Sequence, residues 1–311
     1  MKVSRVTAWG SVPETLTVAA LPPPSPSQLQ VRILAAGLPR VVRLRAARQH
    51  PSALHATLPF DPSIDGVGVD EATGTKYFIG AMAAPLFAEH ANVERSHLVP
   101  LPSDTNPITL AGLANPVTSS WMALQHRVTG GCAGRTVAII GATCASGRAA
   151  ALVARILGAR RVVGVSRNKD SLATVAGLDD AVVLDEQTLT LERPIGPVSI
   201  VLDYVGGKTS VAMMESLEIE PGQNLQYVQS GNLSGTDVMA LPVVVLNKRP
   251  IYLMSSGIGS FSHEDLKAEM PALVGAIARM KPPFEILGVK MEDLGRFWGE
   301  GSRGGKMVVV P

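Results

Sequence analysis

The sequence TVAIIGATCASGRAA at residues 136–150 decides the fold of this chain. Its first five residues are β-branched or apolar, which predicts a buried strand ending at Gly141. Small residues follow, and a helix is predicted from Arg148 to Leu157. A helix that opens at the carboxyl end of a strand points its N–H groups and dipole at an anion. The stretch therefore predicts a parallel sheet with a dinucleotide site at this turn.

The small residues of the turn are the predicted pyrophosphate contacts. These residues are Thr143, Cys144, Ala145, Ser146 and Gly147. The full dinucleotide fingerprint has glycine where this chain has Cys144. We interpret Cys144 as a small filler and not as a nucleophile, because no base is paired with it in the sequence. The alternative is a tight strand-to-helix turn that binds nothing.

The next predicted strand, Arg161 to Val165, ends in Ser166, Arg167 and Asn168. A site for NAD usually has Asp or Glu here to accept hydrogen bonds from the ribose hydroxyls. This chain instead offers a hydroxyl, a guanidinium and an amide, which suit a 2′-phosphate. The sequence thus favours NADP as cofactor. The alternative is that Arg167 is only a solvated residue at the end of a strand.

The pattern of predicted secondary structure changes near residue 115. Before it, short extended runs and prolines predict a β-rich domain; after it, apolar strands alternate with helices, which predicts a parallel sheet covered on both faces. The tail 306–310 is again a strand and is expected to return to the first domain. We predict an α/β protein with domains 1–114 plus 263–311 and 115–262.

Composition excludes several classes of protein. The net charge is +2 without a basic block, so we expect no nucleic-acid partner. No apolar run approaches the roughly 18–20 residues of a membrane span, and no secretory signal is visible. The only cysteines, Cys132 and Cys144, cannot build a disulfide framework or a four-cysteine zinc lobe. A reduced, cytoplasmic protein without a membrane partner is expected.

Short motifs along the whole chain occur in the order and spacing of a known family. The motifs are Ala35–Gly37, Ile64–Gly68, Asn115–Trp121, Gly141–Gly147, Leu202–Gly206, Val228–Gly231, Met254–Gly257 and Gly304–Val308. The chain resembles the zinc-independent, quinone oxidoreductase-like and enoyl reductase-like branch of the medium-chain dehydrogenase/reductase superfamily. The resemblance implies a GroES-like β domain that contains both chain ends and a Rossmann domain between them. It also implies a cofactor in the cleft, and homodimers.

The zinc ligands of other members of this superfamily are missing. Those members use an early Cys, a Gly-His-Glu motif and a later Cys or Asp; here the corresponding segments read Gly37-Leu38-Pro39-Arg40 and Ser63-Ile64-Asp65. We therefore expect no metal. Without a Lewis acid, hydride transfer is easiest to an acceptor that delocalises its own charge. A quinone or a conjugated enone is such an acceptor.

Several further residues are candidates for the site. Thr118 lies where the family has residues near the nicotinamide, although its hydroxyl can equally bond its own helix. Tyr204 follows a strand and could cover a ribose, or be a packing aromatic. His50 lies in the loop that lines the substrate cleft in this family and is the one His proposed as proton donor, although a surface or structural role is the alternative. The polar residues after the last two strands are Ser230, Gly231, Ser255, Ser256 and Gly257.

Three functions remain open from the sequence. The leading one is an NADPH-dependent, metal-free reductase of an activated C=C bond or a quinone; its small-molecule substrate could be an intermediate of specialised metabolism. The second uses the same NADP-binding scaffold for isomerisation or cyclisation without net redox. The third is a non-catalytic binding or regulatory protein, because fold resemblance alone does not decide function.

Overall fold

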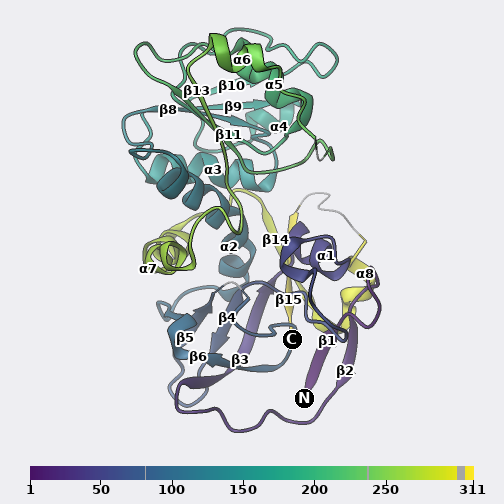
Figure 1. The fold of residues 1–311 in the computed structure, drawn as a ribbon. Helices are drawn as coiled ribbons and strands as arrows, with labels where there is room; N and C mark the ends of the chain where they lie inside the picture. The colour runs from purple at the N-terminus through teal and green to yellow at the C-terminus, as the bar shows by residue number, and fades with distance from the viewer. Residues whose placement is uncertain (81, 237, 300–304) are drawn as a thin grey trace. The chain divides into compact units, whose positions relative to one another are not determined.

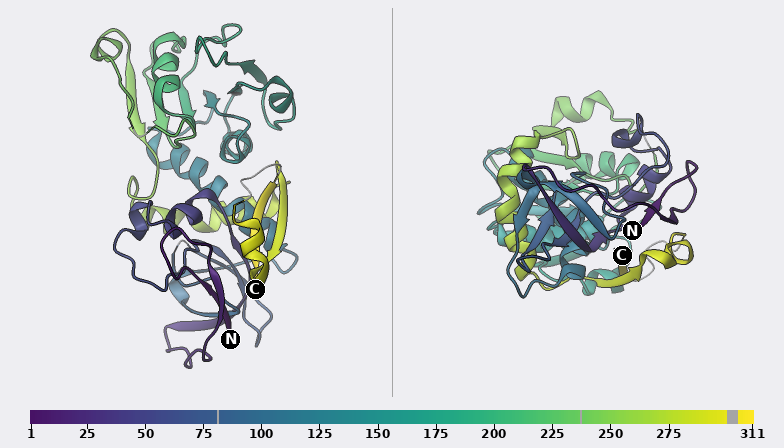
Figure 2. Two further views of the ribbon diagram at one scale, coloured as in Figure 1. Left: turned by 90° about the vertical axis from the view of Figure 1, so that its right-hand side faces the viewer. Right: turned by 90° about the horizontal axis from the view of Figure 1, so that it is seen from below.

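A computed structural model describes residues 1–80, 82–236, 238–299 and 305–311. The chain divides into two compact units (Figure 1), residues 1–115 with 269–311 and residues 116–268. Both chain ends belong to the first unit and lie near one another (Figure 2). The first unit is therefore discontinuous in sequence.

The second unit contains the parallel sheet that the sequence predicts. Six strands pair in the order β10-β9-β8-β11-β12-β13, all parallel. The strands are β8 Thr136–Ile140, β9 Arg161–Ser166, β10 Asp180–Val183, β11 Ile200–Asp203, β12 Leu225–Gln229 and β13 Ile251–Ser255. The helices between them are α3 Ala145–Ile156, α4 Lys169–Ala173, α5 Gly207–Ser216 and α6 Val243–Lys248. Every residue of β8 and β11 is buried, which explains their continuous apolar sequences.

The helix before this sheet contains a proline. Proline favours the first turn of a helix and so predicts a start at Pro116, but α2 runs from Pro107 to Met122 with Pro116 inside it. Proline in a helix interior crowds the carbonyl four residues earlier, and here that residue is Gly112. A π-helical turn, Ala123–Arg127, follows. The prediction of a helix start at Pro116 is therefore wrong, because this proline lies inside the helix. Helix α7, His263–Arg279, also contains a proline, Pro271.

The first unit is built mainly from antiparallel strands. A seven-stranded sheet has the order β14-β15-β3-β4-β5-β7, with β6 paired to β3, and β1 pairs separately with β2. The strands are β1 Lys2–Arg5, β2 Glu14–Thr17, β3 Gln28–Gly37, β4 Gly66–Val69, β5 Lys76–Ile79, β6 His90–Glu94, β7 Leu98–Pro100, β14 Glu285–Lys290 and β15 Gly305–Val310. The helices are α1 Arg40–Ala46 and α8 Leu294–Phe297, with 3-10 turns at Pro51–Ala53, Arg95–His97 and Met291–Asp293.

The tail strand joins this sheet as the sequence predicts. Strand β15 pairs antiparallel with β3 and parallel with β14, a strand that the sequence did not reveal. Gly304, the first residue of the predicted closing motif, lies outside the described residues. Gly66 of the Ile64–Gly68 motif lies against β3, where an added Cβ would come 2.5 Å from the carbonyl oxygen of Ala35. Close approach of two strands therefore explains this glycine.

Candidate active site

The glycine turn joins β8 to α3 with almost no space between them. Gly141 has a φ of +83°, a conformation that side chains disfavour. At Gly147 an added Cβ would lie 2.4 Å from the carbonyl oxygen of Gly141 and 2.7 Å from the Cα of Ala142. Any side chain at 147 would push the helix away from the strand. The turn thus has the close packing of strand against helix that the glycines of the sequence indicate.

Cys144 has a role that the sequence did not reveal. Its thiol is the N-cap of α3 and accepts a hydrogen bond from the backbone N–H of Gly147 at 3.2 Å. Its φ of −72° needs no glycine, which accounts for the departure from the fingerprint. Ala145 and Ser146, in the first turn, have no helical carbonyl to bond their N–H groups. Those two groups are suited to an anion, and the Thr143 hydroxyl beside them lies 2.8 Å from that of Ser166.

The three predicted residues at the end of β9 have different hydrogen-bond or ion-pair partners. Ser166 bonds Thr143, and Asn168 caps α4 by accepting the N–H of Ser171 at 2.8 Å. Arg167 forms an ion pair with Glu186, and both side chains are exposed. Glu186 follows β10, the neighbouring parallel strand. The sequence signal for this ion pair is an acidic residue shortly after the end of the next predicted strand.

A buried carboxylate fixes the loop after β11. Asp203 is fully buried and accepts hydrogen bonds from the N–H groups of Val205, at 2.7 Å, and Gly206, at 3.1 Å. The hydroxyls of Ser210 and Tyr227 also donate to it, the second at 2.6 Å. Four donors thus hold this loop at the carboxyl edge of the sheet, where parallel α/β sheets bind ligands.

Tyr204 follows this aspartate and is itself buried. Its hydroxyl lacks a hydrogen-bond partner within the described residues. Burial raises the pKa of the phenol above its ordinary value, and the nearby Cys144 raises it further, while the hydroxyls of Ser119 and Ser120 oppose the rise. An added Cβ at Gly231 would lie 2.7 Å from the Tyr204 carbonyl oxygen, so the next loop packs directly on Tyr204. The raised pKa keeps the phenol of Tyr204 protonated, so its hydroxyl can donate a hydrogen bond.

The remaining predicted residues of the second unit lie at strand ends or on α2. Ser230 has a buried hydroxyl without a partner in the described part of the chain. Ser256 donates its N–H to Gln229 at 2.9 Å, and Gly257 donates to the Ser260 hydroxyl at 2.8 Å. The carbonyl of Ser255 accepts a bond from Arg127 at 2.9 Å. Thr118 is half-buried on α2.

His50 lies in the first unit, between α1 and a 3-10 turn. Its Nδ1 caps this turn by accepting the N–H of Ser52 at 3.3 Å and lies 2.9 Å from the Ser52 hydroxyl. Burial lowers the pKa of the imidazole, and the positive charge of Arg45 lowers it further.

Asp65 in the first unit escaped sequence reasoning as a titrating group. Its side chain is buried, and its Oδ1 has no hydrogen-bond partner among the described residues. Burial raises the pKa of this carboxyl from 3.8 to about 7. An added Cβ at Gly37 would lie 3.2 Å from Oδ1. The sequence signal was present, because Asp65 immediately precedes a buried strand.

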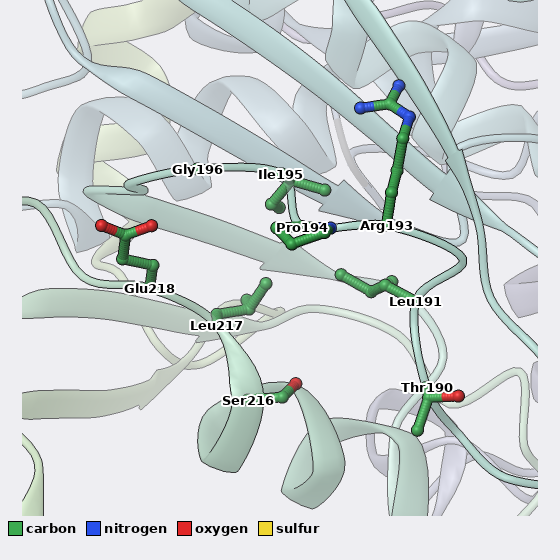
Figure 3. Close-up of a pocket in the computed structure, with 9 residues that line it drawn as sticks. All are labelled: Thr190, Leu191, Arg193, Pro194, Ile195, Gly196, Ser216, Leu217 and Glu218. Carbon is green, nitrogen blue, oxygen red and sulfur yellow. The ribbon is translucent and has the colours of Figure 1, made fainter.

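No group of three His, Cys, Asp or Glu side chains within residues 1–80, 82–236, 238–299 and 305–311 could hold a metal ion. Across the same residues, no helix is long and apolar enough to cross a membrane. A pocket in the second unit (Figure 3) is lined by residues of the segments 190–196 and 216–218. None of the predicted site residues lines it.

Comparison with known proteins identifies one relative over the full length and another over part of the chain. The chain is 45% identical to a probable NADPH-dependent quinone reductase of Emericella nidulans, with both chains covered completely. It is 27% identical to an acryloyl-coenzyme A reductase of Sulfurisphaera tokodaii over 62% of this chain and 58% of that protein. No family model matches the sequence.

Solved structures share the fold. The quinone oxidoreductase of Thermus thermophilus, solved also with NADPH, covers all of both chains at a TM-score of 0.78 and 23% identity. A mycobacterial quinone oxidoreductase covers all of both chains at a TM-score of 0.79 and 19% identity. These likenesses confirm the predicted pairing of a GroES-like β domain with a Rossmann domain. The full-length relative at 45% identity shows that the chain belongs to the quinone oxidoreductase-like family of medium-chain dehydrogenases/reductases.

Proposed function

We propose that the chain is an NADPH-dependent oxidoreductase that transfers hydride, without a metal, to a quinone or to an activated C=C bond. The turn between β8 and α3 carries this proposal, because Gly147 lets the first turn of α3 pack directly against the end of β8, which is the arrangement that binds a pyrophosphate in dinucleotide sites. Relatives named for quinone and acryloyl-coenzyme A reduction support the choice of acceptors. The acceptor is proposed to be an intermediate of specialised metabolism.

The residues present fit the cofactor. The N–H groups of Ala145 and Ser146 suit the pyrophosphate, while Ser166 and Arg167 suit a 2′-phosphate. Arg167 would exchange its exposed partner Glu186 for that phosphate. NADPH would supply the hydride when bound. The chain itself supplies position, exclusion of water and hydrogen-bond donors for the oxygen on which negative charge develops.

Cofactor titration tests the first half of the proposal. Arg167→Ala should weaken NADPH binding by about tenfold to a hundredfold, since a charge-assisted bond contributes about 1.5–3 kcal/mol. NADH binding should barely change. Arg193→Ala is a matched control, because Arg193 is an exposed, ion-paired arginine elsewhere in this unit. An equal loss for both cofactors, or a wild type that prefers NADH, contradicts the assignment of Arg167.

A substrate panel tests the second half. Purified protein treated with a chelator should oxidise NADPH with quinones or enones and should not oxidise simple alcohols. One tightly held zinc per chain that is needed for activity would overturn the metal-free mechanism. Conversion of an acceptor without NADPH consumption would favour isomerisation or cyclisation. NADPH binding without any turnover would favour a non-catalytic role.

We further propose that the functional form is a homodimer joined along β13. This strand ends the six-stranded sheet, and its Tyr252 and Leu253 are exposed. Val243 and Val244 of α6 are exposed as well. An apolar edge strand is suited to pairing with a second copy. Sedimentation should show a dimer for the wild type and a monomer for Leu253→Lys; a monomeric wild type would contradict this.

A further inference from the structure

A hairpin in the second unit follows strand β10 and begins beside the end of β9. Val183 of β10 lies opposite Ser166 of β9, and the N–H of Leu184 donates to the carbonyl oxygen of Ser166 at 2.9 Å. The chain then turns back, and the N–H of Glu192 donates to the carbonyl oxygen of Val183 at 2.9 Å. Residues 185–190 form the tip of this hairpin.

The tip of the hairpin is closed by its own first side chain. The carboxylate of Asp185 accepts the N–H groups of Gln187, at 2.9 Å, and Thr188, at 2.7 Å. It also accepts the hydroxyl of Thr188 at 2.9 Å, and the N–H of Asp185 donates to the carbonyl oxygen of Thr190 at 2.9 Å. Glu186 lies inside this closed turn, so its backbone has a defined place next to β9.

Glu186 forms an ion pair with Arg167, which follows the last residue of β9. The side chains of Arg167 and Glu186 are 63% and 68% exposed. Water and salt screen a pair of this kind, so it adds little to the stability of the fold. The effect of the pair on an anionic ligand of Arg167 is a separate matter, because the ligand and Glu186 then need the same guanidinium.

The place of the pair in a dinucleotide site follows from general rules. In a unit made of a strand, a helix and a second strand, the end of the second strand faces the 2′ position of the adenosine ribose. A site for NAD has a carboxylate there, and a site for NADP has an arginine. Here β8, α3 and β9 form that unit, and both charges lie at its end. Arg167 comes from β9 itself, and Glu186 comes from the hairpin after the next strand.

We propose that Glu186 is a specificity-determining residue, which competes with the 2′-phosphate of NADPH for Arg167 and so limits the preference of this chain for NADPH over NADH. The inference rests on the proposed function, because that function assigns Arg167 to the 2′-phosphate. Binding of NADPH breaks the pair and leaves two anions beside one guanidinium, whereas binding of NADH leaves the pair intact. Glu186 thus lowers the affinity for the phosphorylated cofactor alone.

Calorimetry with two adenosine fragments of the cofactor measures this competition without turnover. The fragment 2′,5′-ADP carries the 2′-phosphate, and 5′-AMP lacks it. Glu186→Gln should bind 2′,5′-ADP about three- to tenfold more tightly than the wild type, because one negative charge near the phosphate is removed. Binding of 5′-AMP should not change. Equal binding of 2′,5′-ADP by the wild type and Glu186→Gln would overturn the competition.

A matched control removes a negative charge elsewhere in the same unit. Glu215 is an exposed glutamate on α5. Glu215→Gln has the same net charge as Glu186→Gln and should bind both fragments as the wild type does. A gain for 2′,5′-ADP in Glu215→Gln equal to that in Glu186→Gln would show an effect of net charge and not of the pair with Arg167.

A second background separates competition for Arg167 from direct repulsion of the phosphate. In Arg167→Ala the ion pair is absent, so adding Glu186→Gln should raise the affinity for 2′,5′-ADP by about twofold or less. The same gain in both backgrounds would overturn the role of Arg167 as the shared partner. With Arg167 present, the gain should shrink between about 0.05 M and about 0.5 M salt, because the pair is exposed. A gain that salt does not change contradicts an electrostatic competition.

Failure of the proposed function gives a different pattern of affinities. If Arg167→Ala binds 2′,5′-ADP as tightly as the wild type does, Arg167 does not contact the phosphate, and both the assignment of Arg167 and the competition are overturned. If Arg167→Ala loses affinity while Glu186→Gln gains none, the assignment of Arg167 stands and only the competition is overturned. Similar melting temperatures of these variants are expected, because both side chains are exposed.

Discussion

Two aspartates are buried, one in each unit, and their carboxyl groups differ in how many hydrogen bonds replace those to water. Asp203 at the end of β11 is 0% exposed and accepts bonds from four donors. Asp65 before β4 is 5% exposed, has an Oδ1 without a partner among the described residues, and has a pKa raised to about 7. Burial is nearly the same. The difference lies in the hydrogen bonds.

This difference in hydrogen bonding shows which of the two aspartates holds its neighbours in place. A buried carboxylate is tolerated where donors replace water, and those donors are then fixed in place. Asp203 fixes the loop that carries Tyr204 and packs against Gly231, at the edge proposed for the cofactor. The Oδ1 of Asp65 has no partner among the described residues and so holds no neighbouring group in place. It contributes a group that titrates near neutrality.

Removing the Asp203 carboxylate should have the largest effect. Asp203→Ala leaves several buried donors unsatisfied and should lower the free energy of unfolding by about 3–5 kcal/mol. Urea denaturation of the variant measures this. The same change should weaken NADPH binding, because the loop 204–207 loses its anchor.

Asp185→Ala is the matched control for this experiment. Asp185 also accepts bonds from two backbone N–H groups and a hydroxyl, those of Gln187 and Thr188, but it is exposed. Its loss should cost less than about 1 kcal/mol, since water replaces the missing partner. Equal losses for the two variants would show that burial does not govern the value of these bonds.

Neutralising Asp65 should have a smaller effect that depends on pH. Its folded-state pKa of about 7 exceeds the ordinary value of 3.8, so the native state binds the proton more tightly than the unfolded state. Wild-type stability therefore falls as pH rises from about 4 to about 7 and is constant above. Asp65→Asn abolishes this loss. Between pH 5 and pH 8 the stability of the variant relative to the wild type should rise by about 2–3 kcal/mol.

Chemical denaturation at the two pH values provides the measurement. Asp70→Asn, on the turn after β4 in the same unit, controls for the loss of one acidic side chain. The conclusion fails if Asp65→Asn and the wild type keep a constant difference across this range.

Local sequence signals were enough to predict the parallel sheet and its glycine turn. Continuous apolar strands, alternating helices and Gly141 to Gly147 depend on neighbours in the chain, so their meaning is visible without coordinates. Pro116 shows the limit of local rules, because α2 continues through it. Strand β14 is largely exposed, and its place beside β15 depends on tertiary pairing.

The sequence does not predict which side chains pair with one another in the candidate site. Asp203 and Tyr227 are 24 residues apart, and Arg167 and Glu186 are 19 apart. Such pairs form because parallel strands bring distant residues to one edge of the sheet. The Cys144 cap was local and could have been predicted from its place before the helix. The orphaned oxygen of Asp65 required a complete account of hydrogen bonds.

Removing one of the four donors to Asp203 tests the difference between Asp203 and Asp65 at the level of a single hydrogen bond. Tyr227→Phe keeps the ring but deletes the hydroxyl that donates at 2.6 Å, and should cost about 1–2 kcal/mol. Burial and the Asp203 charge raise the pKa of this phenol, so it carries its proton at all working pH values. In an Asp203→Ala background the same change should cost less, because the acceptor of this bond is gone. The double-mutant cycle, measured by urea unfolding, isolates the pairwise energy. A coupling energy of zero would mean that Asp203 is satisfied by its other three donors, and that one donor fewer does not move it toward the state of Asp65.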